Sequence, residues 1–328
     1  MATVGHRHDV ACHGLYFNDM IFSGLPDDGL SLGCEHRTAA YLSVPGGIAN
    51  ASIASARLGL RTAMVSDVGD DVVGQGSLVR LRQEGIDTDG CLVHEGWQTP
   101  LTVILNYHGD RTMVTAETPH PGRCVLRQQT PPAARVVIAH LQPFTMPWLM
   151  AAGASGGLVI GSVGWDESGR WDLDRLPDLR HCHAFTPNLT EALHYTRSDD
   201  PERALDALLD HVPLAVITLG GDGAMAADRR TGERVRVPAI PGRFVDASGA
   251  GDVFGAGLAA GLVAGWTLER KIRFAVLVSG LTVQRPGSAT TSPTLGELRI
   301  WHDQLNRDDP LVEQYDFLSE ISTHGAWS

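Results

Sequence analysis

The stretch Val245–Phe254, with the sequence VDASGAGDVF, indicates the fold of this chain more strongly than any other segment. Two glycines flank Ala250, Asp252 follows at once, and a small-residue run of helical character continues to Ala264. Bare backbone at the start of a helix gathers N–H groups, and the helix dipole adds partial positive charge there. The stretch therefore predicts an anion-binding loop that opens a helix.

The position of Asp252 beside this loop predicts its chemistry. A carboxylate is a poor ligand for an anion, because like charges repel, but it can accept the proton of a hydroxyl that attacks the bound group. The amides of Gly249, Ala250 and Gly251 could stabilise the charge that develops on a transferred phosphoryl group. A hydroxyl acceptor and a phosphoryl donor together predict a kinase. The alternative interpretation is a glycine-rich turn with an Asp in the first turn of a helix.

Composition narrows the class of protein. The chain has 328 residues, 43% of them hydrophobic, which is enough for one large or two modest domains. Its formal net charge of −12 argues against a nucleic-acid partner. No apolar run is long enough to predict a membrane span. The polar N-terminus and the five widely spaced cysteines predict a cytoplasmic protein with reduced thiols.

The scarcity of lysine excludes two kinds of phosphate site. Lysine occurs once, at Lys271, and arginine supplies the remaining positive charge. A Walker-A loop ends in Gly-Lys-Ser/Thr, and a protein-kinase site needs a lysine on its third strand. Phosphoryl transfer in this chain would therefore depend on backbone amides, arginine and a metal ion.

Apolar runs of strand length alternate with helical patterns from about residue 50 onward. This alternation predicts an α/β fold whose mostly parallel central sheet is covered by helices on both faces. The expected helices are 48–58, 72–84, 188–195, 202–211 and 254–264. The expected strands are 62–66, 136–139, 158–163, 183–185 and 215–219.

Residues 12–45 and 98–118 interrupt the alternation and predict a small β-sheet lid. The second segment is a hairpin, with strands 101–107 and 111–115 on either side of Gly109-Asp110. We expect one domain over residues 1–328 with these two insertions. A homodimer through the lids would cover apolar lid residues such as Tyr16, Phe17, Leu101 and Val103.

The run Asp246–Asp252, DASGAGD, resembles the C-terminal signature of the ribokinase/PfkB carbohydrate kinase family, D-T-x-G-A-G-D, with Ala247 in the usual place of Thr. Further segments in the family's order extend the resemblance over about residues 10–300. The resemblance implies a ribokinase-like fold and an ATP-dependent kinase acting on a hydroxyl of a sugar or sugar-like molecule. Asp252 would be the general base and Gly249–Gly251 the anion hole.

The resemblance also implies an acceptor site. Asp19, five positions after Gly14, matches the carboxylate that binds sugar hydroxyls, and the run 45–50, PGGIAN, matches the family's N-terminal signature. That run departs from the pattern: two residues separate its glycines from Asn50 where three are usual, and Ile48 replaces the lysine of ribokinase. Both departures weaken a ribose assignment. The implied acceptor residues are Asp19, Gly46, Gly47, Asn50 and Arg111.

The implied cofactors are ATP and Mg²⁺. Asn188 and Glu191 match residues that hold water-bound Mg²⁺ and phosphate, although a helix-capping role explains both as well. The implied nucleotide-binding residues are Asn188, Glu191, Thr218, Gly220, Gly223 and Gly287. A monovalent cation such as K⁺ would bind at Asp246, Ser248 and Thr291.

Several alternatives stay open at this point. A nucleoside kinase shares the fold, and a sugar sensor would share it without turnover. A dinucleotide-dependent oxidoreductase is a further alternative, because Gly249-x-Gly251-x-x-x-Gly255 resembles a dinucleotide fingerprint with spacing one residue too long. His181 and His183 would share one face of a strand, but no second ligand pair supports a zinc site. The stretch 161–166 lacks the D-x-N-x-R pattern of fructokinase-like members, so the acceptor is undetermined.

Overall fold

A large sheet forms the centre of the computed structural model, which describes residues 7–25, 30–38, 40–107, 110–119, 130–154, 157–166, 168–321 and 327. Adjacent strands of this sheet are parallel from β12 to β4, and β13 and β14 extend the sheet by antiparallel pairing. In spatial order the strands are β14 (Arg234–Val237), β13 (Ala224–Asp228), β12 (Leu214–Thr218), β11 (Ala184–Phe185), β10 (Leu158–Ser162), β9 (Ala134–His140), β1 (His8–His13) and β4 (Thr62–Val65).

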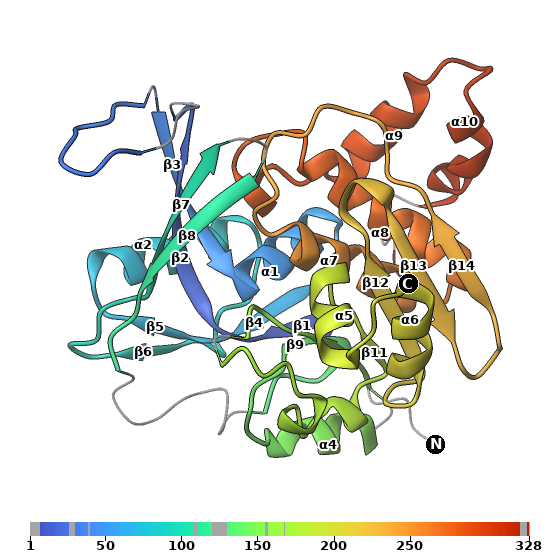
Figure 1. The fold of residues 1–328 in the computed structure, drawn as a ribbon, viewed down its shortest axis with the longest axis horizontal. Helices are drawn as coiled ribbons and strands as arrows, with labels where there is room; N and C mark the ends of the chain where they lie inside the picture. Colours follow the sequence, from blue (N-terminus) through green and yellow to red (C-terminus); the bar gives the residue numbers. More distant parts are fainter. Residues whose placement is uncertain are drawn as a thin grey trace.

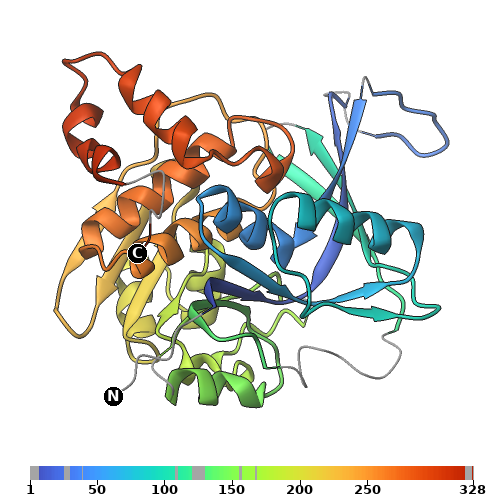
Figure 2. The same cartoon turned by 180° about the vertical axis from the view of Figure 1, so that it is seen from behind.

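Helices cover both faces of this sheet, as Figures 1 and 2 show from opposite sides. The pleat sends alternate side chains to different cores: Val10 and Cys12 join one buried cluster and Ala11 the other. One layer contains α1 (Ile48–Arg57), α7 (Ala250–Val263), α8 (Leu268–Thr282) and α9 (Leu295–Asp303). The other contains α4 (Pro147–Ala154), α5 (Leu189–Thr196) and α6 (Pro201–Leu209). The predicted α/β class is confirmed.

A second sheet of four strands stands beside the main sheet, at the upper left of Figure 1. Its order is β3 (Ala40–Gly47), β2 (Tyr16–Ser23), β7 (Leu101–Tyr107) and β8 (Asp110–Ala116). The β2–β7 pair is parallel, and the other two pairs are antiparallel. This sheet carries Asp19, which lies in the middle of β2.

The remaining elements lie around these two sheets. Asp71 caps helix α2 (Val72–Gln83), and its side chain accepts a hydrogen bond from the N–H of Gly74. A two-stranded parallel sheet joins β5 (Asp67–Gly69) to β6 (Leu92–His94), and α10 (Pro310–Gln314) follows α9. Within the described chain, no helix is long and apolar enough to cross a membrane.

Three expectations need correction. Residues 12 and 13 belong to β1 in the main sheet, so the second sheet begins only at Tyr16. His181 ends a 3₁₀ turn (Leu179–His181) and β11 begins at Ala184, so the two histidines do not alternate on one strand. Tyr16 needs no second subunit for cover, because it is buried in its own chain and donates a hydrogen bond to Ser77.

Helices α7 and α8 pack closely together, and small residues permit this approach. A Cβ built on Gly257 would lie 2.7 Å from the Cα of Ala275 in α8, whereas one built on Gly255 would meet no atom within 4 Å. We expect Gly257→Ala to lower the free energy of unfolding by about 1–3 kcal/mol, because backbone must move. Gly255→Ala, the control in the same helix, should be neutral or stabilising by up to about 1 kcal/mol. Urea unfolding measures both, and equal losses would contradict this packing.

Candidate active site

The glycine loop opens α7 as the sequence predicts, with one difference in its donors. Gly249 has φ 68°, a left-handed conformation that favours glycine. The N–H of Ala250 turns back to the carbonyl of Ala247 at 3.2 Å. The N–H groups of Gly251 and Asp252 donate to no residue in the described part of the chain. The loop therefore offers free amides at a helix start, although Ala250 is not one of them.

Asp252 lies beside these amides and is held by two side chains from distant parts of the sequence. Asn50, in α1, places Nδ2 3.3 Å from Oδ2 of Asp252. His140, the last residue of β9, places Nε2 3.3 Å from Oδ1. The Asp252 side chain is 22% exposed, so an acceptor can still reach it. The carboxylate is thus oriented and accessible.

Asn50 is oriented in turn by Ser288, in a 3₁₀ turn (η4, Ser288–Thr291) that follows α8. Ser288 Oγ lies 2.9 Å from Oδ1 of Asn50 and 2.8 Å from the carbonyl oxygen of Ser248. Both partners are acceptors, so the single hydroxyl proton is shared between them. This arrangement directs the amide nitrogen of Asn50 toward Asp252. The predicted contact of Asn50 with an acceptor hydroxyl stays a prediction.

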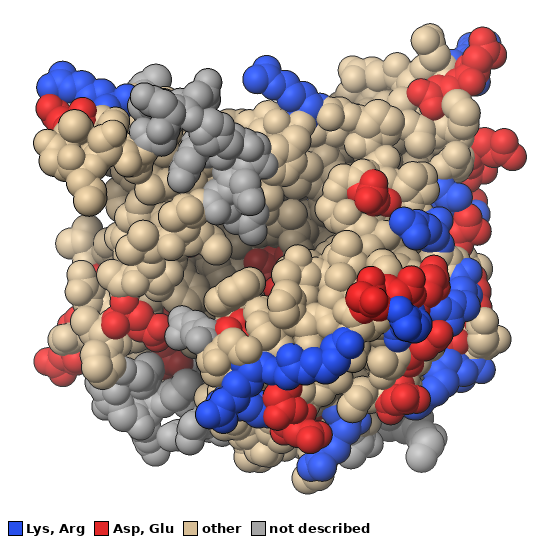
Figure 3. Space-filling view, in the orientation of Figure 1, with Lys and Arg blue, Asp and Glu red and all other residues tan. Residues whose placement is uncertain are grey.

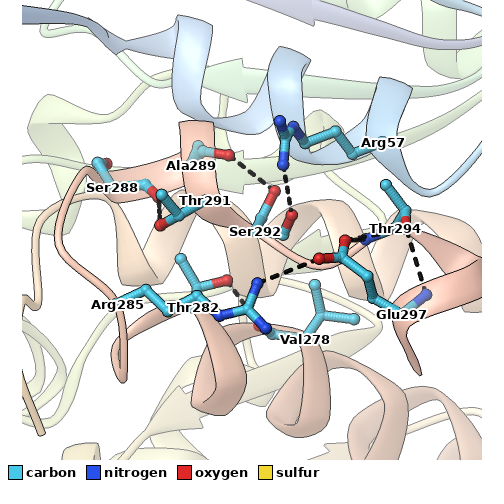
Figure 4. Close-up of polar contacts among 10 residues, drawn as sticks. All are labelled: Arg57, Val278, Thr282, Arg285, Ser288, Ala289, Thr291, Ser292, Thr294 and Glu297. Carbon is cyan, nitrogen blue, oxygen red and sulfur yellow. Dashed lines mark hydrogen bonds and ion pairs between the residues drawn. The ribbon is translucent and has the colours of Figure 1, made fainter. Parts of the chain in front are cut away.

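The turn that carries Ser288 is fixed by its own polar contacts, which Figure 4 shows. Ser292 Oγ donates to the carbonyl of Ala289, and Arg57 Nη1 donates to the carbonyl of Ser292. Arg285 pairs with Glu297 rather than with the glycine loop. Both arginines therefore stabilise the segment that supports the site.

A cavity of about 390 Å³ adjoins the glycine loop and is suited to a nucleotide. Thr218, Gly220 and Gly223 line it, as expected for nucleotide-binding residues. Figure 3 shows the molecule hollowed near its centre on the face of Figure 1, with acidic atoms visible at depth. The other lining residues include Ile240, Phe244, Val276, Val283 and Gln284, which sequence reasoning missed, and the Ala250 and Gly251 end of the loop.

Asn188 and Glu191 form a capping box at the start of α5. The side chain of Asn188 accepts from the N–H of Glu191, and Oε2 of Glu191 accepts from the N–H of Asn188, each at 2.9 Å. Burial, and secondarily the charge of Asp252, raise the pKa of Glu191 to about 7. A buried carboxylate of this kind is stabilised in its ionised form by a nearby cation. Capping and cation binding are compatible in this geometry.

Asp19 is the second buried carboxylate of the site, 7% exposed. Gly46 in the neighbouring strand makes room for it, because a Cβ there would lie 2.1 Å from Oδ2 of Asp19. Among the described residues, none donates a hydrogen bond to this carboxylate. Burial, followed by the charges of Asp252 and Asp246, raises the pKa of Asp19 to about 7. Its free acceptor oxygens are suited to substrate hydroxyls.

Asp246 links the segments around the loop. Its Oδ1 accepts from the N–H of Ser248 at 2.9 Å and lies 3.5 Å from Nδ2 of Asn106, at the end of β7. Its Oδ2 accepts from the N–H of Gly287 at 3.1 Å. Gly287 therefore lies against Asp246 and is not among the described residues that line the nucleotide cavity.

Gly47 and Arg111 are the remaining residues of the predicted acceptor site. Gly47, at the end of β3, has φ 58° and precedes α1, close to the carbonyl of Leu15. The side chain of Arg111 lies outside the described residues, so its contact with an anionic substrate group stays a prediction.

His140 is the principal residue that sequence reasoning missed. One signal could have indicated it: β9 is parallel to its neighbours, and ligand sites in such sheets lie at the carboxyl ends of the strands. A polar residue that ends an apolar strand at that edge is a site candidate on this ground.

Solved structures of other proteins share this fold. A putative ribokinase from Agrobacterium tumefaciens superposes with a TM-score of 0.75 at 20% identity, covering 91% of this chain and 99% of that one. A putative ribokinase II from E. coli, solved in complex with ATP and Mg²⁺, superposes with a TM-score of 0.72 at 20% identity, covering 90% of this chain and 99% of that one. At these identities the likeness shows the fold.

Two relatives found by sequence are more similar to this chain in sequence identity than those solved structures are. The chain is 32% identical over 283 residues to the bifunctional protein HldE of Magnetococcus marinus, covering 77% of this chain and 55% of that protein. The chain thus spans about half the length of this relative. A fructokinase from Klebsiella pneumoniae is 31% identical over 246 residues, covering 68% of this chain and 78% of that one.

The doubly covered sheet, the small second sheet and the glycine loop at a helix start define a ribokinase-like protein. The chain belongs to the pfkB family of carbohydrate kinases, whose family model matches residues 8–122 and 136–295. It is an ATP-dependent carbohydrate kinase. The dinucleotide-dependent oxidoreductase considered from the sequence is set aside.

Proposed function

We propose that this kinase transfers the γ-phosphoryl group of ATP to a hydroxyl of a sugar-like acceptor, with Asp252 as the general base. The observation that carries the proposal is the position of Asp252. Its oriented, accessible carboxylate adjoins free loop amides on one side. Its charge also acts on the buried, unbonded carboxylate of Asp19. A base between an anion site and a hydroxyl-binding group is what phosphoryl transfer requires.

The proton and the phosphoryl group move in opposite directions in the proposed step. The acceptor hydroxyl, bound by Asp19, gives its proton to Asp252 as its oxygen bonds to the γ-phosphorus. The bond from that phosphorus to the β,γ-bridging oxygen breaks, and ADP leaves. The loop Gly249–Gly251 would stabilise the charge on the transferred group through its free amides, principally that of Gly251, with the N–H of Asp252 adding a further donor.

The residues present fit Mg²⁺. Magnesium prefers oxygen ligands and keeps several waters, and Glu191 supplies a buried carboxylate whose ionised form a cation would favour. Glu191 would hold the ion through water, with Asn188 beside it. When bound, the ion neutralises phosphate charge. The side chains of Asn188 and Glu191 hold each other in place through the capping box.

A monovalent cation site at Asp246, Ser248 and Thr291 is supported by one unsatisfied atom. Ser248 Oγ is buried without a hydrogen-bond partner in the described structure, next to the buried Asp246. Thr291 Oγ, in contrast, donates to the carbonyl of Ser288 at 3.0 Å. We expect replacement of K⁺ by tetramethylammonium at constant ionic strength to lower kcat. Unchanged turnover would remove the cation from the account.

The identity of the acceptor decides between a sugar kinase and a nucleoside kinase of this fold. The direct test is ADP formation with a panel of D-ribose, D-fructose, a sugar acid, fructose 6-phosphate and adenosine. We expect a sugar-like acceptor to stimulate ADP formation. Stimulation by adenosine alone would support the nucleoside kinase, and no stimulation with ATP still bound would support a sensor.

The small sheet is proposed to act as a lid. It carries Asp19 and reaches the glycine loop through the contact of Asn106 with Asp246. Closure over the acceptor would exclude water from the γ-phosphoryl group. We expect the acceptor to slow hydrogen exchange in β2, β3, β7 and β8, with α6 as an internal control. Equal exchange with and without acceptor would rule out closure.

A homodimer through the lids stays a proposal with a narrower basis. Phe17, Leu101 and Val103 are half-buried, but Tyr41 and Val114, on the outer strands β3 and β8, are 57% and 61% exposed. A second copy would cover such residues. Sedimentation equilibrium tests this, and a monomer at micromolar concentration would exclude it.

A further inference from the structure

Each carboxylate oxygen of Asp252 faces a different side-chain donor, and one of them, His140, has no part in the reaction described so far. His140 Nε2 lies 3.3 Å from Oδ1, while Asn50 Nδ2 lies 3.3 Å from Oδ2. The two donors come from β9 and α1, which are far apart in the sequence. Both distances are long enough to shorten when the acceptor is bound.

The imidazole ring of His140 packs directly against the backbone of Gly14. A Cβ built on Gly14 would lie 2.7 Å from both Cγ and Nδ1 of His140, so any side chain there would displace the ring. The backbone of Gly14 is held on the other side, where its carbonyl accepts from Ser66 Oγ at 2.7 Å and its N–H donates to Val65 at 3.3 Å. These two hydrogen bonds hold the backbone of Gly14 in place. Because Gly14 has no side chain, His140 can occupy the space beside it.

We propose that His140 is a positioning residue for Asp252, an inference that rests on the proposed function. The terminal torsion of an Asp side chain is broad, so external donors must orient the carboxylate. With its proton on Nε2, His140 donates to Oδ1 while Asn50 donates to Oδ2. Each carboxylate oxygen has more than one acceptor site, so capacity remains for the acceptor hydroxyl. The His140 side chain is 18% exposed, so the contact with Asp252 is partly accessible to solvent.

The test compares variants with ATP and whichever panel compound gives the highest rate of ADP formation. His140→Ala should lower kcat about 10–100-fold, because a misplaced base costs about this much, with the KM of ATP unchanged. His140→Gln, which can still present an N–H, should recover most of the loss. In an Asp252→Asn background, His140→Ala should cause no further loss, because the base through which it acts is gone.

Gly14→Ala supplies a second route to the same result. It should lower kcat as His140→Ala does, because the new methyl group displaces the ring. Combined with His140→Ala, which vacates the space, it should add no further loss. If His140→Ala does not fold, His140→Asn replaces it, because the shorter amide cannot reach Asp252.

The outcomes separate this inference from the proposed function. Full kcat in His140→Ala, together with a large loss in Asp252→Asn, would overturn the role of His140 and leave the base in place. An equal loss from His140→Ala with and without Asp252 would show that the histidine does not act through that carboxylate. Full activity in Asp252→Asn would instead overturn the proposed mechanism itself.

Discussion

Replacement of Asp252 by Asn is expected to lower kcat by about 10²–10⁴-fold, the usual contribution of a general base. Asn has nearly the same shape, and its Oδ1 can accept from Asn50 while its amide nitrogen donates to Nε2 of His140, once the proton of the ring is on Nδ1, so the fold should persist. The change removes the proton acceptor and leaves the loop amides in place. ATP binding, measured by titration calorimetry in the presence of Mg²⁺, should therefore change little.

A matched control is available at Asp199, an exposed carboxylate paired with Arg203. Asp199→Asn should keep the kcat and thermal stability of the parent. Retention of near-parental kcat in Asp252→Asn would show that another group takes the proton.

Asp19→Ala is expected to have the second large effect, a rise in the KM of the acceptor with little change in the KM of ATP. The reason is structural: Asp19 is buried in β2 and bonds no described residue, so its oxygens are free for substrate hydroxyls. Loss of a charged acceptor bond costs about 1.5–3 kcal/mol, or roughly 10–150-fold in kcat/KM. Equal effects on both substrates would indicate that Asp19 supports the fold instead.

The raised pKa of Asp19, about 7, adds a pH dependence. The ionised form accepts substrate hydroxyls best, so kcat/KM for the acceptor should fall as pH drops through about 7. Asp19→Asn should lose that limb of the profile. Persistence of the limb in Asp19→Asn would assign it to another group, for which Glu191 is the first candidate.

The stability of the fold should depend on pH in the opposite sense to kcat/KM: ionisation of Asp19 favours acceptor binding but lowers the free energy of unfolding. Burial disfavours the ionised carboxylate of Asp19 in the folded state, whereas the unfolded chain ionises near pH 4. Between about pH 4 and 7 the folded protein therefore binds more protons at Asp19 than the unfolded chain does. The contribution of Asp19 to the free energy of unfolding falls as pH rises through that window. Asp19→Asn should raise the free energy of unfolding at pH 8 by about 1–3 kcal/mol and have less effect at pH 4.

Local sequence patterns predicted much of this fold. The helix predicted over 48–58 is α1, with Gly59 beyond its end, and the 188–195 pattern gave α5 with its capping box. The glycine run before α7 predicted the anion loop because helix-start chemistry is encoded within a few residues. Prediction failed where a short segment had no regular period, as at His181 and His183.

The contacts around Asp252 could not be predicted, because they join residues far apart in the sequence. Asn50 lies 202 positions from Asp252 and His140 lies 112 positions away. Their approach depends on strand register and on the packing of α1 against α7, neither of which a local pattern encodes. The packing of His140 against Gly14 also depends on long-range structure, because Gly14 follows β1, His140 ends β9, and these two strands are neighbours in the sheet.

Product stoichiometry tests most directly whether this kinase transfers a phosphoryl group to a hydroxyl of the acceptor. The acceptor selected from the panel is incubated with ATP and Mg²⁺, ADP is quantified, and the acceptor is analysed by mass spectrometry. We expect one phosphate ester on the acceptor for each ADP formed, and about 10²–10⁴-fold slower formation of both with Asp252→Asn. ADP accompanied by free phosphate and an unmodified acceptor would contradict it.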